Sequence, residues 1–324
     1  MDLRTQTGNE LITAEQVDLL SLHSIRLFAT KWVDNVPARR LDMIILCANT
    51  MTPKGGQIQV SEDGIESSYA LNYLANFQLL SILSPALRAQ PPDRDVRILF
   101  GTCSSYIGGQ VLEQIPRPNL TATLKPGSKA KRTPPIANNP SAAYGSSKLA
   151  LMTFASAFQK HLSAYTRPDN QPMNARVIMI NPGWCRTPGM RRFLTFGSLW
   201  GLAAYLLMWP IWWLVLKSPE QGAQTFLYAA MEAEFARGEG GVLLKECKVQ
   251  KIYRDEITDE GKQKMLWEVS EKAIEALEKD GAIVRAKEKR QNGEKNKEKP
   301  VEQEQTSSGT QGKKEGSRRS RKAA

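Results

Sequence analysis

The sequence predicts an α/β fold in which helices cover both faces of a doubly wound parallel sheet. Two observations support this prediction. One short segment is a continuous apolar run and two others are mainly apolar, as expected of parallel strands that are buried on both faces. Between them lie segments with apolar residues three or four positions apart, and strands that alternate with such helices favour a parallel sheet. The strand segments are residues 43–47, 96–102 and 175–180.

The elements follow in chain order. Residues 17–20 indicate a short strand end, and Ser21 has the side-chain type that caps a helix expected to end near Asp34. A second helix is expected over residues 65–87, after the first apolar strand. Residues 106–140 carry Pro, Lys and Asn without periodicity, which predicts a long loop beside the site.

Residues 146–158 predict the central helix, because apolar residues recur there at helical steps. Tyr144 and Lys148 are four positions apart, so they share one face of this helix. A fixed ammonium favours the phenolate form and lowers the pKa of a neighbouring phenol, which makes the pair a proton-transfer device. The same pair also occurs on ordinary helix surfaces, so its meaning depends on the rest of the chain.

Composition limits the function classes. Hydrophobic residues make up 41% of the 324, enough for one α/β domain over residues 1–284, with a basic disordered tail over 285–324. The tail contributes +7 of the net charge of +11, through 13 Lys/Arg and 6 Asp/Glu. It contains no aromatic residue for base stacking, so no nucleic-acid partner is expected. Four scattered cysteines and two histidines give no metal-site spacing, and free thiols in a reducing compartment are expected.

Residues 259–280 predict an amphipathic helix, and residues 196–216 form a stretch of 21 residues without a charge. As one helix rising about 1.5 Å per residue, the uncharged stretch is long enough to cross a bilayer of about 30 Å. Pro210 makes a re-entrant or interfacial hairpin the alternative, and a buried substrate lid is a third reading. We expect membrane association through this stretch.

Several motifs in chain order resemble those of the short-chain dehydrogenase/reductase family, in its retinol-dehydrogenase-like branch. Tyr144-x-x-x-Lys148 matches the active-site motif of this family. The other matching segments lie within about residues 10–275, at 41–51, 62–66, 71–77, 97–105, 181–188, 241–249 and 266–271. The resemblance implies a Rossmann-type fold and an NAD(P)-dependent oxidoreductase that interconverts an alcohol and a carbonyl.

The resemblance also implies roles for single residues. Tyr144 would donate a proton to the substrate carbonyl oxygen or accept one from the alcohol. Lys148 would lower the pKa of Tyr144 and hydrogen-bond the nicotinamide ribose. Asn72 would hold a proton-relay water, whereas the alternative is a buried helix Asn bonded to backbone. A strict count along the strand puts Cys103 at the serine position of the family. A one-residue slip puts Ser104 there, and Ser104 is preferred because a thiol is a poor hydrogen-bond donor.

The cofactor assignments come from the same resemblance. The resemblance implies NADP as the cofactor, with NAD as the alternative. Besides Tyr144 and Lys148, the cofactor-binding residues would be Asp18, Cys47, Ala48, Asn49, Pro182, Gly183, Cys185 and Thr187. Asn49 stands where the family has glycine. No G-x-x-x-G-x-G or G-x-G-x-x-G motif precedes residue 40, where backbone amides would hold the pyrophosphate.

By family comparison the first strand, first helix and second strand are therefore missing, so the fold is N-terminally truncated. We expect that the chain as given begins late, and a truncated relative is the alternative. The expected partners are a hydrophobic substrate and a membrane or lipid-droplet surface, on the cytoplasmic face of the endoplasmic reticulum or droplet. The chain is also compatible with a homo-oligomer. The competing function is a catalytically inactive relative that serves as a membrane-bound binding or scaffold protein.

Overall fold

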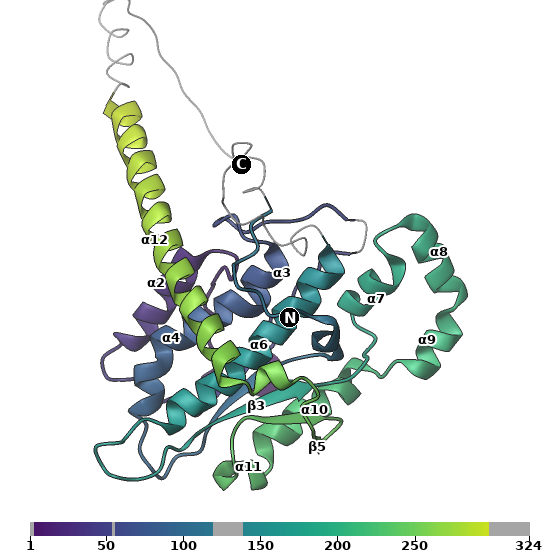
Figure 1. Cartoon of the computed structure of the whole chain (residues 1–324), viewed down its shortest axis with the longest axis horizontal. Coiled ribbons are helices and arrows are strands. Elements are labelled where there is room, and N and C mark those ends of the chain that lie inside the picture. Colours follow the sequence, from purple (N-terminus) through teal and green to yellow (C-terminus); the bar gives the residue numbers. More distant parts are fainter. Residues whose placement is uncertain (1–2, 54–55, 119–138, 298–324) are drawn as a thin grey trace, which may run out of the picture. The chain divides into compact units, whose positions relative to one another are not determined.

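A computed structural model of the chain describes residues 3–53, 56–118 and 139–297 (Figure 1). The chain divides into two compact units, Met1–Lys279 and Asp280–Ala324. The described residues include a short first helix, α1 (Leu3–Thr7). Part of the predicted loop, residues 119–138, and part of the predicted tail, residues 298–324, lie outside the described residues.

A five-stranded sheet in the order β1-β2-β3-β4-β5 forms the centre of the first unit. Its first four strands are parallel, and β5 returns antiparallel to β4. The prediction of a mostly parallel sheet is therefore confirmed. The strands are β1 (Met43–Leu46), β2 (Val96–Gly101), β3 (Ala175–Asn181), β4 (Val242–Lys245) and β5 (Lys248–Gln250).

Strand β1 lies at the edge of this sheet, since its neighbour among the described residues is β2 on one side. Ile45 in β1 is accordingly 51% exposed, although its segment has the composition of a buried strand. The strand end predicted at residues 17–20 is wrong, because these residues form coil and a turn. A strand needs a hydrogen-bonded neighbour, and none of the described strands lies beyond β1 to provide one.

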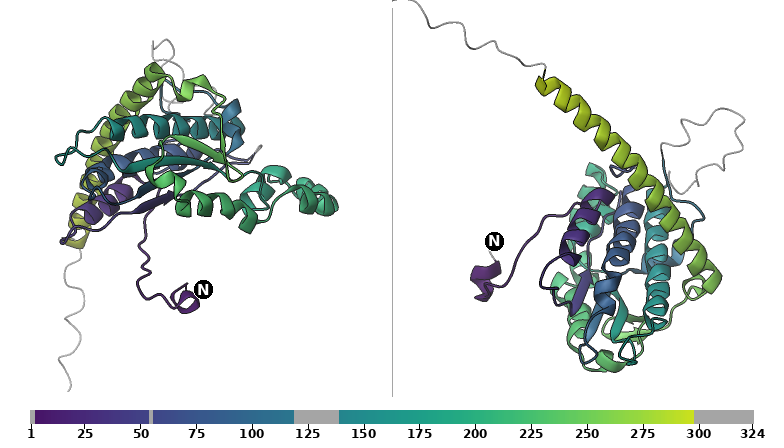
Figure 2. Two further views of the ribbon diagram at one scale, coloured as in Figure 1. Left: turned by 90° about the horizontal axis from the view of Figure 1, so that it is seen from below. Right: turned by 90° about the vertical axis from the view of Figure 1, so that its left-hand side faces the viewer.

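Helices cover the two faces of the sheet unequally (Figure 2). One face carries α2 (Leu22–Val33), α4 (Ala75–Arg88), α6 (Pro140–Ser163) and the part of α12 (Glu260–Lys297) that belongs to the first unit, and the other carries α10 (Pro219–Met231) and α11 (Glu234–Arg237). Alternate residues of β2 serve the two faces. Ile98 and Phe100 belong to the larger apolar core, whereas Leu99 belongs to the smaller one.

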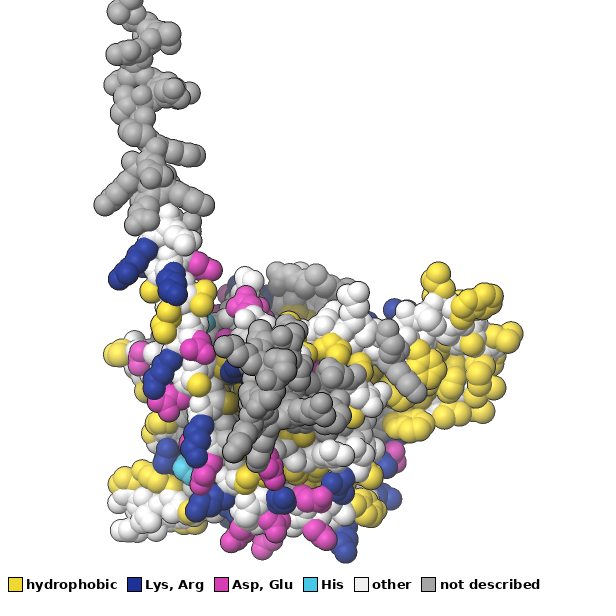
Figure 3. Space-filling view, turned by 45° about the horizontal axis from the view of Figure 1, so that its top comes forward, with side chains coloured by type: hydrophobic (Ala, Val, Ile, Leu, Met, Phe, Trp, Pro, Cys, Tyr) yellow, Lys and Arg dark blue, Asp and Glu magenta, His cyan; other side chains and the backbone are white. Residues whose placement is uncertain are grey.

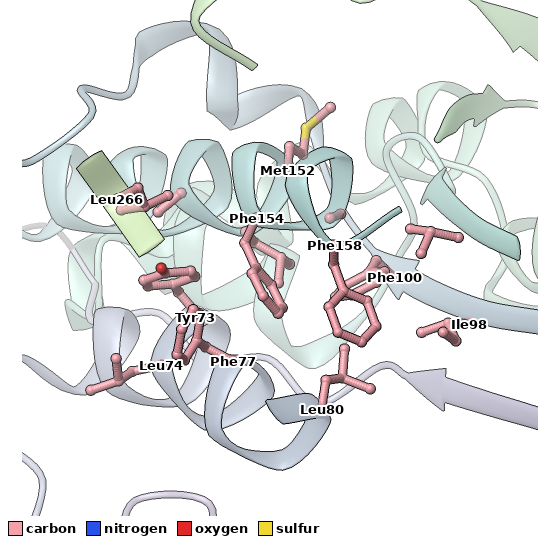
Figure 4. Close-up of a cluster of buried hydrophobic side chains, with 14 of the residues drawn as sticks. Tyr73, Leu74, Phe77, Leu80, Ile98, Phe100, Met152, Phe154, Phe158 and Leu266 are labelled. Carbon is pink, nitrogen blue, oxygen red and sulfur yellow. The ribbon is translucent and has the colours of Figure 1, made fainter. Parts of the chain in front are cut away.

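The larger core is built around Phe154 of α6, whose side chain is 1% exposed (Figure 4). Its ring centre lies 4.9 Å from that of Phe77 in α4 and 5.7 Å from that of Trp267 in α12. Further along α12, Leu266 and Ile274 are buried, which confirms the predicted amphipathic helix. The helix continues to Lys297, so residues 285–297 are helical and not the start of a disordered tail. Their Lys, Glu, Ala and Gln residues favour helix.

Residues 196–216 do not form one long helix. They contain two short ones, α8 (Leu199–Leu207) and α9 (Trp209–Val215), which follow α7 (Pro188–Thr195). The break falls at Met208, and Pro210 lies in the first turn of α9, where its missing N–H group is tolerated. In the part of the chain that the structure describes, none of the helices combines the length and apolar character needed to span a membrane.

Four further short helical segments lie between the longer elements. The turn η2 (Ser104–Gly108) follows β2, and η4 (Asp255–Ile257) precedes α12. Before α4, the chain passes through α3 (Ser67–Tyr69) and then through the π-helical turn η1 (Ala70–Leu74).

Two buried tyrosines of the core predict opposite effects of one substitution. Tyr69 is fully buried, and its hydroxyl has no hydrogen-bond partner among the described residues, whereas the hydroxyl of Tyr73 lies 2.6 Å from Ser270 Oγ. We expect Tyr69→Phe to raise the free energy of unfolding and Tyr73→Phe to lower it, each by about 1 kcal/mol. Denaturant unfolding of both variants measures these changes. A loss of stability in Tyr69→Phe would contradict this assignment.

The same tyrosines make the fold sensitive to alkali. Burial raises the pKa of both phenols above the ordinary value, so the folded state keeps protons that the unfolded chain has lost. Their contribution is therefore fully present below pH of about 10 and is lost as the pH rises further. The loss is up to about 1.4 kcal/mol per pH unit for each tyrosine. The slope should be smaller in Tyr69→Phe.

Candidate active site

The carboxyl ends of β1, β2 and β3 meet the N-terminal part of α6, the edge at which parallel α/β sheets bind ligands. Helix α6 begins in a defined way: Asn139 caps it through a hydrogen bond from the N–H of Ala142 (3.4 Å), and Pro140 occupies its first turn. This cap fixes the first turn of the helix. Tyr144 lies one turn after the cap, and Lys148 lies one turn further along.

The phenol of Tyr144 accepts two hydrogen bonds. Asn49 Nδ2 donates to its oxygen at 3.3 Å, and Cys103 Sγ approaches the same oxygen at 3.4 Å. Among the described residues, none accepts the proton of Tyr144. The structure thus brings Tyr144 together with one residue from the end of β1 and one from the end of β2, and leaves the phenolic proton available to another oxygen atom.

Lys148 is buried, with 3% of its surface exposed. Its ammonium donates to the backbone oxygen of Gly101 at 3.0 Å and lies 5.9 Å from the centre of the Tyr144 ring. Burial lowers the pKa of Lys148, and the nearby thiols of Cys103 and Cys47 act in the opposite direction. The hydrogen bonds of the described residues use one of its three N–H donors, so the others remain available to a ligand.

The expected lowering of the Tyr144 pKa is not what the structure shows. Burial of the phenol raises its pKa above the ordinary value, Cys103 adds to that effect, and the hydrogen bond from Asn49 opposes it. Desolvation disfavours the phenolate more than the surroundings stabilise it. Tyr144 is therefore protonated throughout the physiological pH range.

Asn72 connects two elements of the site. It lies in the π-helical turn η1, a distortion that often marks functional sites. Its amide accepts from the N–H of Thr50 (2.9 Å) and donates to the oxygen of Thr50 and to Ser147 Oγ (both 3.0 Å). Ser147 in turn donates to the backbone oxygen of Tyr144 at 2.8 Å. Asn72 thus makes the backbone contacts expected of a buried helix Asn, and it links the loop after β1 to α6. Its role in holding a proton-relay water stays a prediction.

The two candidates for the serine position point to different places. Ser104 Oγ accepts a hydrogen bond from Asn181 Nδ2 at 3.0 Å, and Asn181 Oδ1 accepts from the N–H of Gly183 at 3.0 Å. Ser104 thereby supports the turn after β3. Cys103, and not the preferred Ser104, contacts the phenol of Tyr144.

The remaining predicted residues surround this centre or lie apart from it. Gly183 has φ of +80°, a backbone conformation that favours glycine, whereas Asn49 keeps a negative φ. Cys185 is buried, and Thr187 caps α7 by accepting from the N–H of Met190 at 3.3 Å. Cys47 and Ala48 directly follow β1, and Pro182 follows β3. The hydrogen bonds of Asp18 reach only its neighbours Leu20, Ser21 and Ser24 in the described residues, so the structure does not bring Asp18 to the other site residues.

A cavity of about 630 Å³ lies elsewhere, between the end of α6 and the starts of β3 and β4. It is lined by polar and charged side chains such as Gln159, Arg167 and Arg176, and none of the predicted site residues lines it. Parallel sheets bind ligands at the opposite edge, so this cavity is not the candidate active site.

A comparison with models of known protein families finds no match. Among known proteins, the chain is 44% identical over 279 residues to the uncharacterized oxidoreductase pbr1 of Schizosaccharomyces pombe, covering 86% of this chain and 71% of that protein. Retinol dehydrogenase 13 of Homo sapiens is 29% identical over 274 residues, with coverages of 84% and 72%. Polyprenol dehydrogenase of Mus musculus is 30% identical over 267 residues, with coverages of 82% and 69%.

Among solved structures, that of a protein from Mycobacterium paratuberculosis superimposes with a TM-score of 0.50. The two sequences are 22% identical, and the match covers 85% of this chain and 81% of the other. This similarity concerns the fold alone.

Proposed function

The chain belongs to the short-chain dehydrogenase/reductase family and is an oxidoreductase, and we propose that it interconverts an alcohol and a carbonyl on a hydrophobic, lipid-like substrate with NAD(P) as cofactor. One observation carries the proposal. The phenol of Tyr144 accepts hydrogen bonds from two strand ends, keeps its own proton available, and lies one helical turn from a buried ammonium.

The residues present fit the nicotinamide end of the cofactor. Lys148 has N–H donors to spare for a ribose hydroxyl, and the turn at Gly183 follows β3 at the same edge of the sheet. Residues 1–40 supply no glycine-rich turn for the pyrophosphate. The preference for NADP over NAD follows from the family resemblance.

The mechanism assigns one task to each side chain. The cofactor, when bound, supplies or takes the hydride. Tyr144 donates its proton to the carbonyl oxygen during reduction and takes a proton from the hydroxyl during oxidation. Lys148 places positive charge beside the phenolate that forms, in a site from which burial has removed water. Asn49 and the thiol of Cys103 hold the phenol in position by donating to its oxygen.

The substrate class is proposed from two facts. Two relatives are named for hydrophobic alcohols, retinol and polyprenol. The segment that follows the turn at Gly183 leads into the uncharged stretch 196–216. We therefore place the enzyme at a membrane or lipid-droplet surface, on the cytoplasmic face of the endoplasmic reticulum or droplet, and a homo-oligomer is compatible with this placement.

The test uses the protein tagged at its own locus and purified from the cells that make it. We expect consumption of reduced nicotinamide cofactor with hydrophobic aldehydes or ketones, and slower consumption with short, water-soluble ones. Absence of turnover with every carbonyl and alcohol, in a preparation that binds the cofactor, would overturn the proposal.

The position of Cys103 favours a second candidate function, that of a catalytically inactive relative that binds or scaffolds at a membrane. A thiol is a weak hydrogen-bond donor, so it stabilises a developing oxyanion less well than a hydroxyl. Under the enzymatic proposal, we expect Cys103→Ser to raise kcat by about tenfold. Cys247→Ser, which changes a thiol in the turn between β4 and β5 that lies 3.9 Å from Thr225 Oγ1, is the matched control. Cofactor binding without turnover in both the parent chain and Cys103→Ser would favour the inactive relative.

A further inference from the structure

Residues 196–216, which we call the apolar arm, expose large apolar side chains on their outer surface. Trp200 is 88% exposed, and Leu199 and Leu207 are each 85% exposed. In Figure 3 hydrophobic side chains gather over α8 and α9 at one end of the face shown. Soluble monomers rarely expose a contiguous apolar surface of this kind, so the arm requires a partner.

The arm is a preformed hairpin and not an unfolded segment. The ring of Tyr205 in α8 stacks on Trp212 in α9, with the ring centres 6.1 Å apart. At the base, the N–H of Arg186 donates to the oxygen of Lys217 at 2.8 Å, and the N–H of Lys217 donates to the oxygen of Trp184 at 2.9 Å. These backbone bonds hold the two ends of the arm together. Its inner faces are therefore packed, and the outer side chains are left for a partner.

The distribution of the exposed side chains favours lipid over a protein partner. Leu199 and Trp200 are consecutive and both exposed, and so are Trp213 and Leu214. Consecutive positions of a helix point about 100° apart, so the apolar surface is wider than the single stripe that a partner helix covers. Lipid chains can contact such a helix from all sides.

Charge and length specify how the arm meets the lipid. Residues 187–216 contain no acidic residue, whereas Arg191 and Arg192 in α7 are exposed beside the arm, as suits anionic headgroups. At about 1.5 Å per residue, α8 and α9 are roughly 14 Å and 10 Å long, against about 30 Å for the apolar part of a bilayer. Neither helix can cross it.

We infer that the apolar arm docks in the plane of one leaflet of an anionic bilayer, without spanning it, while Arg191 and Arg192 contact the headgroups. At the base of the arm, Lys217 bonds the backbone of Trp184 and Arg186, which follow the end of β3, where Asn181 bonds Ser104. The arm therefore leaves the sheet at the edge where the candidate active site lies. The membrane is thus the partner of the apolar arm. Only the use of this docking, which is to deliver an apolar substrate, rests on the proposed function.

The test is flotation of the full chain with vesicles of phosphatidylcholine alone or mixed with phosphatidylserine. We expect flotation with the mixed vesicles and a loss of at least about tenfold in binding for Leu207→Glu combined with Leu214→Glu. Both side chains are exposed, so the substitutions should leave the fold intact. The matched control replaces two exposed apolar residues outside the arm, Leu11→Glu with Met231→Glu, and should float like the parent chain.

Two further measurements separate the alternatives. Arg191→Gln with Arg192→Gln should weaken binding to the anionic vesicles on the order of tenfold at low salt. Quenching of Trp fluorescence should be stronger with bromine near the headgroup end of the lipid chains than near the bilayer centre. Failure to float, equal flotation of the Glu variant, or a lipid-free dimer that the same variant disrupts would overturn the inference. Turnover of a water-soluble aldehyde tests the proposed function separately, since it needs no membrane.

Discussion

Tyr144→Phe should abolish nearly all turnover. The substitution removes the phenolic oxygen that accepts from Asn49 and Cys103, and with it the proton available to a substrate oxygen. Removing a positioned general acid typically lowers a rate on the order of 10²–10⁴. The loss should appear in kcat, because the phenyl ring that remains fills the same space and leaves the binding of the substrate's apolar part unchanged. Steady-state kinetics on the protein purified from its own cells measures it.

Tyr69→Phe provides the matched control. It removes a hydroxyl from a buried tyrosine of the core that makes none of the site's contacts among the described residues, so kcat should not change. Unchanged turnover in Tyr144→Phe would show that this phenol does not transfer the proton. A loss of activity in both variants would indicate a structural effect instead.

The elements predicted correctly are those whose composition alone determines their environment. The apolar runs at β2 and β3 are buried on both faces, and such runs have few alternatives to a central parallel strand. The hairpin of β4 and β5 could not be predicted in the same way. Its two turn residues, Glu246 and Cys247, both have positive φ, a conformation for which the usual signal is Asn-Gly.

The candidate site was predictable where helical spacing fixes it. Tyr144 and Lys148 are four residues apart on α6, and the structure places them on one face as the spacing requires. The choice between Cys103 and Ser104 could not be made from spacing. The chain leaves β2 and turns into η2 at Ser104, which directs that hydroxyl to Asn181 and leaves Cys103 at the phenol.

The apolar arm shows a different limit of composition. Twenty-one uncharged residues indicate contact with lipid or a core, but the way they fold depends on a local feature, the helix break at Met208 before Pro210. The break converts one long helix into two short ones packed through Tyr205. The same apolar side chains therefore lie on the outer surface of a short hairpin and not along one spanning helix. Composition alone is compatible with both arrangements.

Lys148→Met should make the protein more stable and almost inactive. Lys148 is 3% exposed, its ammonium donates a hydrogen bond to the oxygen of Gly101, and it forms no ion pair among the described residues. A buried charge without a partner of opposite sign destabilises the fold, and methionine fills similar space without one. We expect a gain of about 1–3 kcal/mol in the free energy of unfolding, after allowing for the lost hydrogen bond. We also expect a fall in kcat on the order of 10²–10³.

The pH dependence identifies the cause of that gain. Because the pKa of Lys148 is lowered in the folded state, the cost of its charge is largest below the folded pKa. It fades as the pH rises towards the unfolded value of about 10.4, so the stability difference between the two chains should shrink over that interval.

Lys160→Met is the matched control on the same helix. Its ammonium is exposed and lies 3.2 Å from Glu260, so the change should stay within about 0.5 kcal/mol and leave kcat unaltered. Thermal unfolding at several pH values, combined with kinetics, distinguishes the outcomes. If Lys148→Met were less stable than the parent chain, the ammonium would stabilise α6. It would then not be a charge kept for catalysis at the expense of stability.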